Sequence, residues 1–246
     1  MSSERARTRA SWAAALVLTG VVVVFNPMAG GAGLRAFLGI GQDVTFTITD
    51  SGPSYPRGAY AFALTQPGSD EPVTWDPCPE IHYVVNPDGG PADQQELVAH
   101  AVRDLTEASG LRFEYDGTTD DRTFSHRSRA FGDQPPVLIG WATPDEVPAL
   151  AGDVAGVGGS EARSAGPDRL AYVTGMVALD RDAFAAMADR PGPDVRGAIV
   201  EHELVHVLGL GHVDDPAQLM YAETTDRTTL GAGDRAGLAR VGGTCN

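Results

Sequence analysis

Half of the histidines in this sequence fall within one dozen residues, "EHELVHVLGLGH" at positions 201–212. Residues four apart lie on the same face of a helix, so His202 and His206 project together and could hold one metal ion. Glu203 is rotated by about 100° around the helix axis, which takes it out of that ligand pair. From there its carboxylate could reach a water molecule on the same metal, as the H-E-x-x-H pattern requires.

The residues after this pattern can supply a third ligand. Gly209 comes three positions after His206, and glycine readily adopts the left-handed conformation that ends a helix. The chain can then turn and bring His212 back toward the other two histidines. Three neutral imidazoles with one open position are typical of a catalytic zinc site. The alternative, a buried helix with incidental histidines, is disfavoured because clustered imidazoles are costly to bury without partners.

The whole segment resembles the metzincin motif H-E-x-x-H-x-x-G-x-x-H. Met220, eight residues after the last histidine and within "LMY", resembles the Met-turn of the matrixin branch. The ending "LGAGDRAGLARVGG" is similar to the matrixin C-terminal helix. The motif positions are occupied by His202, Glu203, His206, Gly209 and His212.

This resemblance implies an α+β (mixed α/β) zincin domain with a twisted, mostly parallel sheet, an active-site helix, a Met-turn and a C-terminal helix. It implies a zinc endopeptidase whose protein or peptide substrate lies extended against the edge strand of the sheet. One catalytic Zn²⁺ would be held by His202, His206 and His212. Glu203 would be the catalytic base, and its carboxylate would need no unusual pKa because the metal makes water acidic. A calcium site has no support, since no D-x-[DN]-x-[DN]-G run is present.

The sequence also departs from the matrixin pattern. Val213 follows the third histidine, where matrixins usually carry a small hydroxyl residue. Tyr221 directly follows Met220, whereas the tyrosine ligand of astacins and serralysins sits two positions after the methionine, so we do not assign Tyr221 to zinc. The cysteine-switch motif is missing from "WDPCPEI". We therefore expect a bacterial-type, matrixin-like relative. The alternatives are a non-catalytic zinc-binding or adhesion domain that retains the fold, and a membrane-anchored structural protein.

The elements that must position this site read as a mixed α/β domain over residues 73–246. A helix is expected between Pro91 and Gly110, from the helical spacing of its apolar residues and the glycine that follows. Asp194 could cap the helix that carries the histidines. A short C-terminal helix follows, and strands are expected at 81–85, 111–115, 136–142 and 169–179.

The first 72 residues are predicted to lie outside that domain. Arginines at positions 5, 7 and 9 precede an apolar run from Trp12 to Phe25 and the small residues of "NPMAGGAG". This is typical of a signal peptide or N-terminal membrane anchor over 1–38, with anchorage through 12–38, and predicts an exported or cell-surface protein. Residues 39–72 are interpreted as a linker, a short pro-segment or a small hairpin packed on the main domain.

Charge and cysteine content agree with export. The net charge is −15 and every basic residue is arginine, which argues against nucleic-acid binding because an acidic surface repels phosphate backbones. Cys78 and Cys245 form an even pair, which in an exported chain predicts one disulfide. The alternative is a latency device in which Cys78 binds zinc as a thiolate.

Few residues outside the motif carry chemistry. Asp214 and Asp215 could hydrogen-bond an imidazole or cap the turn after the third histidine. The remaining histidines have no neighbouring ligands in the sequence and are interpreted as surface or sheet residues: His82, His100 and His126.

Overall fold

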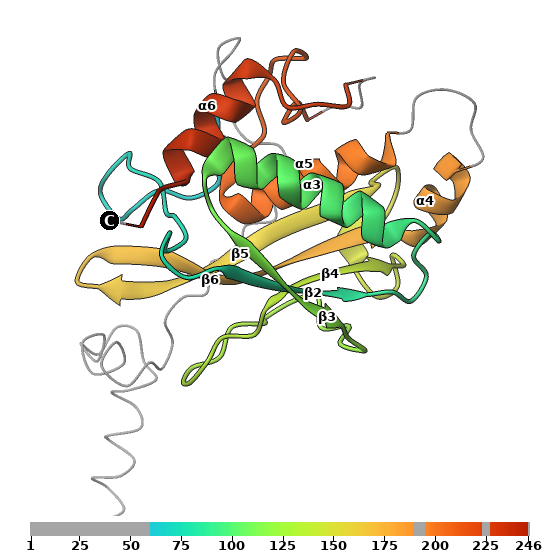
Figure 1. The fold of residues 1–246 in the computed structure, drawn as a ribbon, viewed down its shortest axis with the longest axis horizontal. Helices are drawn as coiled ribbons and strands as arrows, with labels where there is room; N and C mark the ends of the chain where they lie inside the picture. Colours follow the sequence, from blue (N-terminus) through green and yellow to red (C-terminus); the bar gives the residue numbers. More distant parts are fainter. Residues whose placement is uncertain (1–59, 189–194, 223–226, 246) are drawn as a thin grey trace, which may run out of the picture. The chain divides into compact units, whose positions relative to one another are not determined.

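The computed structural model describes residues 60–188, 195–222 and 227–245. Its framework is a five-stranded sheet in the order β3-β2-β4-β6-β5 (Figure 1). Four strands run parallel, and β5 pairs antiparallel with β6 at one edge. The prediction of a mixed α/β domain with a mostly parallel sheet is confirmed. The strands are β2 (Ile81–Asn86), β3 (Phe113–Thr118), β4 (Val137–Ala142), β5 (Gly156–Gly166) and β6 (Arg169–Asp180).

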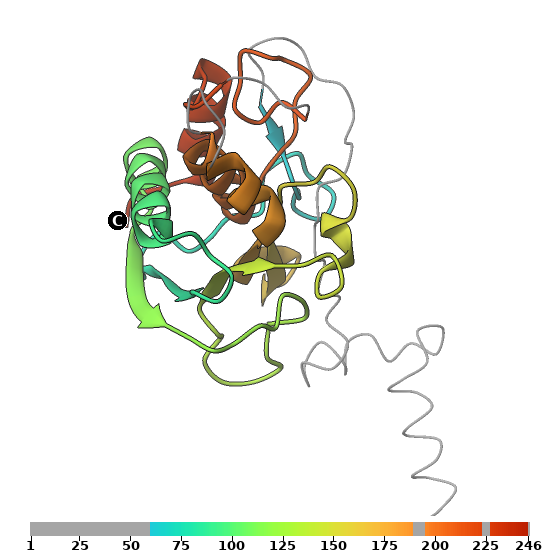
Figure 2. The ribbon, with the colours of Figure 1, turned by 90° about the vertical axis from the view of Figure 1, so that its right-hand side faces the viewer.

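Helices cover one face of this sheet, as Figures 1 and 2 show. In α3, Val98, Ala101 and Leu105 are buried at helical spacing. This helix ends at Gly110, whose backbone is left-handed (φ 76°), as the sequence predicts. The other helices are α4, α5 and α6, with a short 3₁₀ turn, η1. Their bounds are α3 Gln94–Ser109, η1 Pro148–Leu150, α4 Arg181–Ala188, α5 Arg196–Leu208 and α6 Ala232–Val241.

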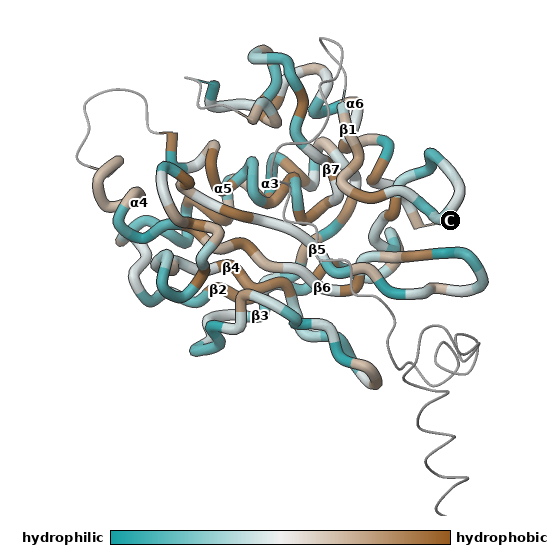
Figure 3. Tube along the Cα trace, turned by 180° about the vertical axis from the view of Figure 1, so that it is seen from behind, coloured by the Kyte–Doolittle hydropathy of each residue, from teal (hydrophilic) through white to brown (hydrophobic). Residues whose placement is uncertain are grey.

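The central strand β4 is buried on both faces, so its side chains divide between two apolar clusters. Ile139 and Trp141 face the helices, whereas Leu138 faces a second cluster with Phe124 and Met176. Side chains of a strand point alternately to its two faces, and strands covered on both sides are hydrophobic throughout. Figure 3 shows this concentration of apolar residues in the sheet.

A buried arginine holds the long loop between β3 and β4. The Arg127 guanidinium donates to the Asp121 carboxylate at 2.8 Å and to two backbone carbonyls, of Thr123 and Pro136. Buried Glu161 of β5 accepts hydrogen bonds from the backbone N–H groups of Arg127 and Ser128. The loop is therefore ordered against the sheet by charge-assisted hydrogen bonds.

The edge strand β5 and helix α4 are not predicted by the sequence. The β5 segment "GVGGSEARSAG" is rich in glycine, which has low strand propensity. Its glycines are explained by tertiary packing, because a Cβ at Gly158 would lie 2.2 Å from the backbone oxygen of Glu203 in α5. The strand predicted at 111–115 is also displaced, to 113–118.

Part of the predicted connecting segment belongs to the folded unit. The structure describes residues 60–72 of the range 39–72, and β1 (Ala61–Phe62) pairs antiparallel with β7 (Leu210–Gly211). The predicted signal or anchor at 1–38 and the proposed cap Asp194 lie outside the described residues. Among the described helices, none has the length and apolar character needed to cross a membrane.

The two cysteines form the predicted disulfide, Cys78–Cys245. The partners are separated by 167 residues, so the chain-entropy model assigns the bond about 5 kcal/mol of stabilisation. The bond joins the segment before β2 to the segment after α6. Because Cys78 is in this disulfide, its sulfur is not available as the thiolate ligand that the latency alternative requires.

Candidate metal centre

Helix α5 and the turn after it bring the three motif histidines together. The helix ends at Gly209, with φ +106° and an N–H that bonds to the carbonyls of Val205 and His206. A Cβ at Gly209 would also lie 2.7 Å from the ring of Tyr172. This position therefore needs glycine for its backbone conformation and for the close contact. The prediction that Gly209 ends the helix is confirmed.

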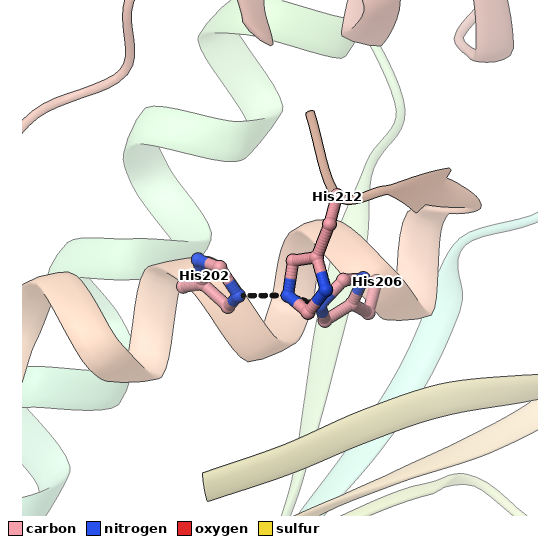
Figure 4. Close-up of side chains that lie close together, drawn as sticks. All are labelled: His202, His206 and His212. Atoms are coloured by element: carbon pink, nitrogen blue, oxygen red, sulfur yellow. Dashed lines mark hydrogen bonds between the residues drawn. The ribbon is translucent and has the colours of Figure 1, made fainter. Parts of the chain in front are cut away.

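The three imidazoles converge on one point through their Nε2 atoms (Figure 4). Nε2 of His212 lies 3.0 Å from that of His202 and 3.1 Å from that of His206. A tetrahedral zinc ion with ligand nitrogens at 2.0–2.1 Å spaces them by roughly 3.3 Å. The observed spacing thus fits a metal of this size with little adjustment.

The outer nitrogens of two of these rings are fixed by backbone carbonyls. Nδ1 of His202 donates to Leu219 O, and Nδ1 of His206 donates to Leu210 O, both at 2.8 Å. The Nε2 atoms of His202 and His206 then each carry a lone pair. Both lone pairs face Nε2 of His212, which can donate only one hydrogen. A cation would satisfy all three nitrogens, so the residues fit a metal ion.

Burial favours the neutral form of His202 and His206, which is the form that binds metal. It lowers the pKa of His202 below its ordinary value, against the opposing effect of the hydrogen bond to Leu219. It lowers the pKa of His206 still further, helped by the neighbouring imidazoles.

Glu203 lies against the edge strand β5 rather than in solvent. It is buried, and a Cβ at Gly156 would lie 2.9 Å from its Cγ. Burial raises the pKa of Glu203 to about 8, against a hydrogen bond from the backbone of Gly158 that lowers it. This differs from the expectation of an ordinary pKa. The pKa of Glu203 is raised because burial removes water from its carboxylate. A cation at the histidine cluster would lower this pKa again, because it stabilises the charged form.

The segment that holds His202 is itself held by α6. Buried Asp234 accepts hydrogen bonds from the N–H groups of Leu219 at 2.6 Å and Met220 at 3.3 Å. Gln218 Oε1 also accepts from the first turn of α6. Sequence reasoning missed both residues. The available signal was an acidic residue in the first turn of the C-terminal helix, which is also a common capping feature.

The other sequence candidates have the following contacts. Asp215 accepts from the backbone of Ala217 and from the Gln218 amide, so it supports the turn, as one of its two interpretations requires. Val213 is buried, and its N–H donates to Met220 O. The remaining histidines are exposed: His82, which pairs with Asp116; His100, near Asp104; and His126.

No family model and no curated protein matches the sequence. Among solved structures, the chain is similar to high choriolytic enzyme 1, a hatching enzyme zinc-protease from the medaka fish Oryzias latipes. The likeness has a TM-score of 0.29 and 16% sequence identity, and it covers 56% of this chain and 50% of that chain. The chain thus spans about half the length of that structure. We therefore interpret the metal centre from its own geometry.

Proposed function

We propose that this chain is an exported zinc-dependent endopeptidase, related to the metzincins and most similar to their matrixin branch. The observation that carries the proposal is the convergence of three Nε2 atoms, with a buried carboxylate one residue from the first ligand. His202, His206 and His212 would hold the metal, and Glu203 would be the catalytic base.

Each side chain has a defined task in peptide hydrolysis. A bound zinc ion supplies Lewis acidity, which makes water acidic and polarises a carbonyl oxygen. Glu203 accepts a proton from the attacking water at its carboxylate and transfers it to the nitrogen of the leaving amine. The backbone carbonyls of Leu219 and Leu210 keep the rings of His202 and His206 oriented throughout.

The edge strand suggests how a substrate would bind. Among the described strands, β5 pairs only with β6, so no described strand occupies its other edge. Glu203 packs against Gly156 at the start of β5. An extended peptide that adds to this edge would pass close to the catalytic base, and its main chain would supply much of the affinity.

Two further features support the finer assignments. Met220 lies directly after the residue that accepts the His202 hydrogen bond, as expected for a Met-turn, and α6 follows as in the matrixin pattern. Export is supported by the disulfide Cys78–Cys245, since such bonds persist outside the reducing cytosol.

The proposal is tested with the purified full chain and Glu203→Gln. We expect about one zinc per chain in both proteins and casein cleavage only by the wild type, sensitive to a chelator. The variant should lose activity by about 100- to 10,000-fold, because its amide keeps the shape and cannot take a proton. Glu114→Gln, an exposed site on β3, is the control. Zinc binding without wild-type cleavage would favour the non-catalytic alternative, and absence of zinc would reject the metal centre.

A further inference from the structure

The short strand β7 connects two of the three metal-binding histidines. It occupies the two residues between Gly209, which ends α5, and His212. Its first residue, Leu210, provides the carbonyl that accepts from Nδ1 of His206. The position of this strand therefore sets the orientation of one ligand and the starting point of another.

The chain upstream of the sheet holds β7 in place. In the β1–β7 pair, Ala61 lies opposite Gly211 and Phe62 opposite Leu210. Directly beyond the pair, the N–H of Ala63 donates to Gly209 O at 2.8 Å. Within the described strands, β1 is the only partner of β7, so the route from α5 to His212 depends on it.

The side chain of Gln66 binds the same segment to strand β6 of the sheet through hydrogen bonds. The side chain of Gln66 donates to Leu170 O at 3.0 Å and accepts from Leu170 N at 2.8 Å. It also donates to Pro72 O, and Val73 N donates to Leu64 O, so residues 64–73 form a closed turn. Two hydrogen bonds to one residue fix both position and direction of the segment.

The end of the segment stabilises the last turn of α5. Nε1 of Trp75 donates at 2.9 Å to Val207 O, which lies at the helix end without an intrahelical partner and also accepts from Ser160 Oγ of β5 at 2.7 Å. The Trp75 ring packs against Tyr172, which in turn covers Gly209. The contact therefore acts one residue from His206.

We infer that residues 60–75 are a positioning segment of the metal centre, in which β1 places the return to His212 and Trp75 fixes the end of the histidine helix. This rests on the proposed zinc function. The inference also predicts where the chain can be shortened. Removal of the N-terminal residues should preserve the metal centre only if the cleavage point lies before Tyr60. This role predicts that residues 60–72 stay with the domain, whether the rest of 39–72 is a linker or a short pro-segment.

The test uses the full chain and two variants that act by different routes. Ala63→Pro removes the N–H that bonds to Gly209 O. Trp75→Phe keeps an aromatic ring but removes one of the two side-chain donors to Val207 O, and Ser160 Oγ remains. Ala130→Pro, the same substitution as Ala63→Pro at an exposed loop position outside residues 60–75, is the matched control. Two readouts are measured: zinc affinity by chelator competition, and amide hydrogen exchange at 209–212 in metal-free protein.

We expect zinc affinity to fall about 10- to 100-fold in Ala63→Pro and less in Trp75→Phe, because loss of groups that orient ligands has effects of this size. Exchange at 209–212 should accelerate in both variants relative to exchange in α3, and Ala130→Pro should resemble the wild type. Unchanged exchange and affinity within twofold in both variants would overturn the inference. A wild type that binds no zinc would instead reject the proposed function, while the exchange data would still decide whether the segment holds 209–212.

Discussion

The carboxylate of Asp234 and the imidazole of His202 are joined through a single peptide group. The Leu219–Met220 peptide donates its N–H to Asp234 at 3.3 Å and accepts from Nδ1 of His202 through its carbonyl at 2.8 Å. An acidic group at one end of a peptide makes the carbonyl at its other end a better acceptor, because linked hydrogen bonds polarise one another. His202 is thus coupled to α6, a separate element.

We therefore expect Asp234→Asn to weaken zinc binding by about tenfold, since it replaces an acceptor oxygen with an N–H₂ group among three backbone donors. The donors are the N–H groups of Leu219, Met220 and Gly231. Zinc affinity is measured by chelator competition, together with the free energy of unfolding. Leu138→Ala, in the second apolar cluster, controls for destabilisation and should keep zinc affinity. Equal losses of affinity in the two variants would show that Asp234 acts through stability alone.

His212→Ala should abolish tight zinc binding while leaving α5 intact. It removes one of the three proposed protein ligands and the ring whose Nε2 faces both other histidines. Metal analysis after dialysis measures the bound zinc, and circular dichroism checks the helix content. His82→Ala, at an exposed site, is the control and should retain one zinc per chain. Undiminished zinc in His212→Ala would remove this residue from the ligand set.

Two glycine substitutions near the histidine helix should change stability in opposite directions. A Cβ at Gly158 would meet Glu203 O at 2.2 Å, so Gly158→Ala must push α5 away from β5 and cost several kcal/mol. At Gly197, inside α5, the nearest atom to a Cβ is 3.8 Å away, so Gly197→Ala should stabilise by about 0.5–1 kcal/mol through helix propensity. Denaturant unfolding measures both. A stable Gly158→Ala protein would contradict the close contact between strand and helix.

Glu146 should make the fold sensitive to acid. The Arg122 guanidinium, with further hydrogen bonds from Thr143, lowers the pKa of Glu146 from 4.5 to about 2, against opposing desolvation. A depressed folded-state pKa gives stability that is complete above pH 4.5 and is lost as the pH falls toward 2. Because this carboxylate is 39% exposed, we expect Glu146→Gln to cost at most about 1 kcal/mol at pH 7.

The difference between wild type and Glu146→Gln should shrink as the pH falls from 4.5 to 2. Unfolding is measured with a chelator present, so that loss of metal in acid does not contribute. Asp145→Asn corrects for the loss of a neighbouring charge. A difference that stays constant down to pH 2 would show that the ion pair with Arg122 does not shift this group.

The sequence by itself determined the local features of the site. His202, Glu203 and His206 are placed by the period of one helix, and Gly209 must end that helix because glycine tolerates a positive φ. Both are properties of short segments, so spacing and residue type are sufficient to predict them. The central strand β4 is likewise predicted by its continuous apolar run, which is a property of the local sequence.

Only the tertiary structure decided which residues, far away in the sequence, hold the three histidines in position. The roles of Asp234, Trp75 and Ala63 arise from contacts across 15, 132 and 146 residues, counted from Asp234 to Leu219, from Trp75 to Val207 and from Ala63 to Gly209. The edge strand β5 could not be predicted for a related reason. Its glycines lower the strand propensity of the segment, but the close approach of α5 requires them. The residue types at these positions depend on contacts with elements that come close only when the chain folds. The local sequence pattern therefore cannot predict their roles.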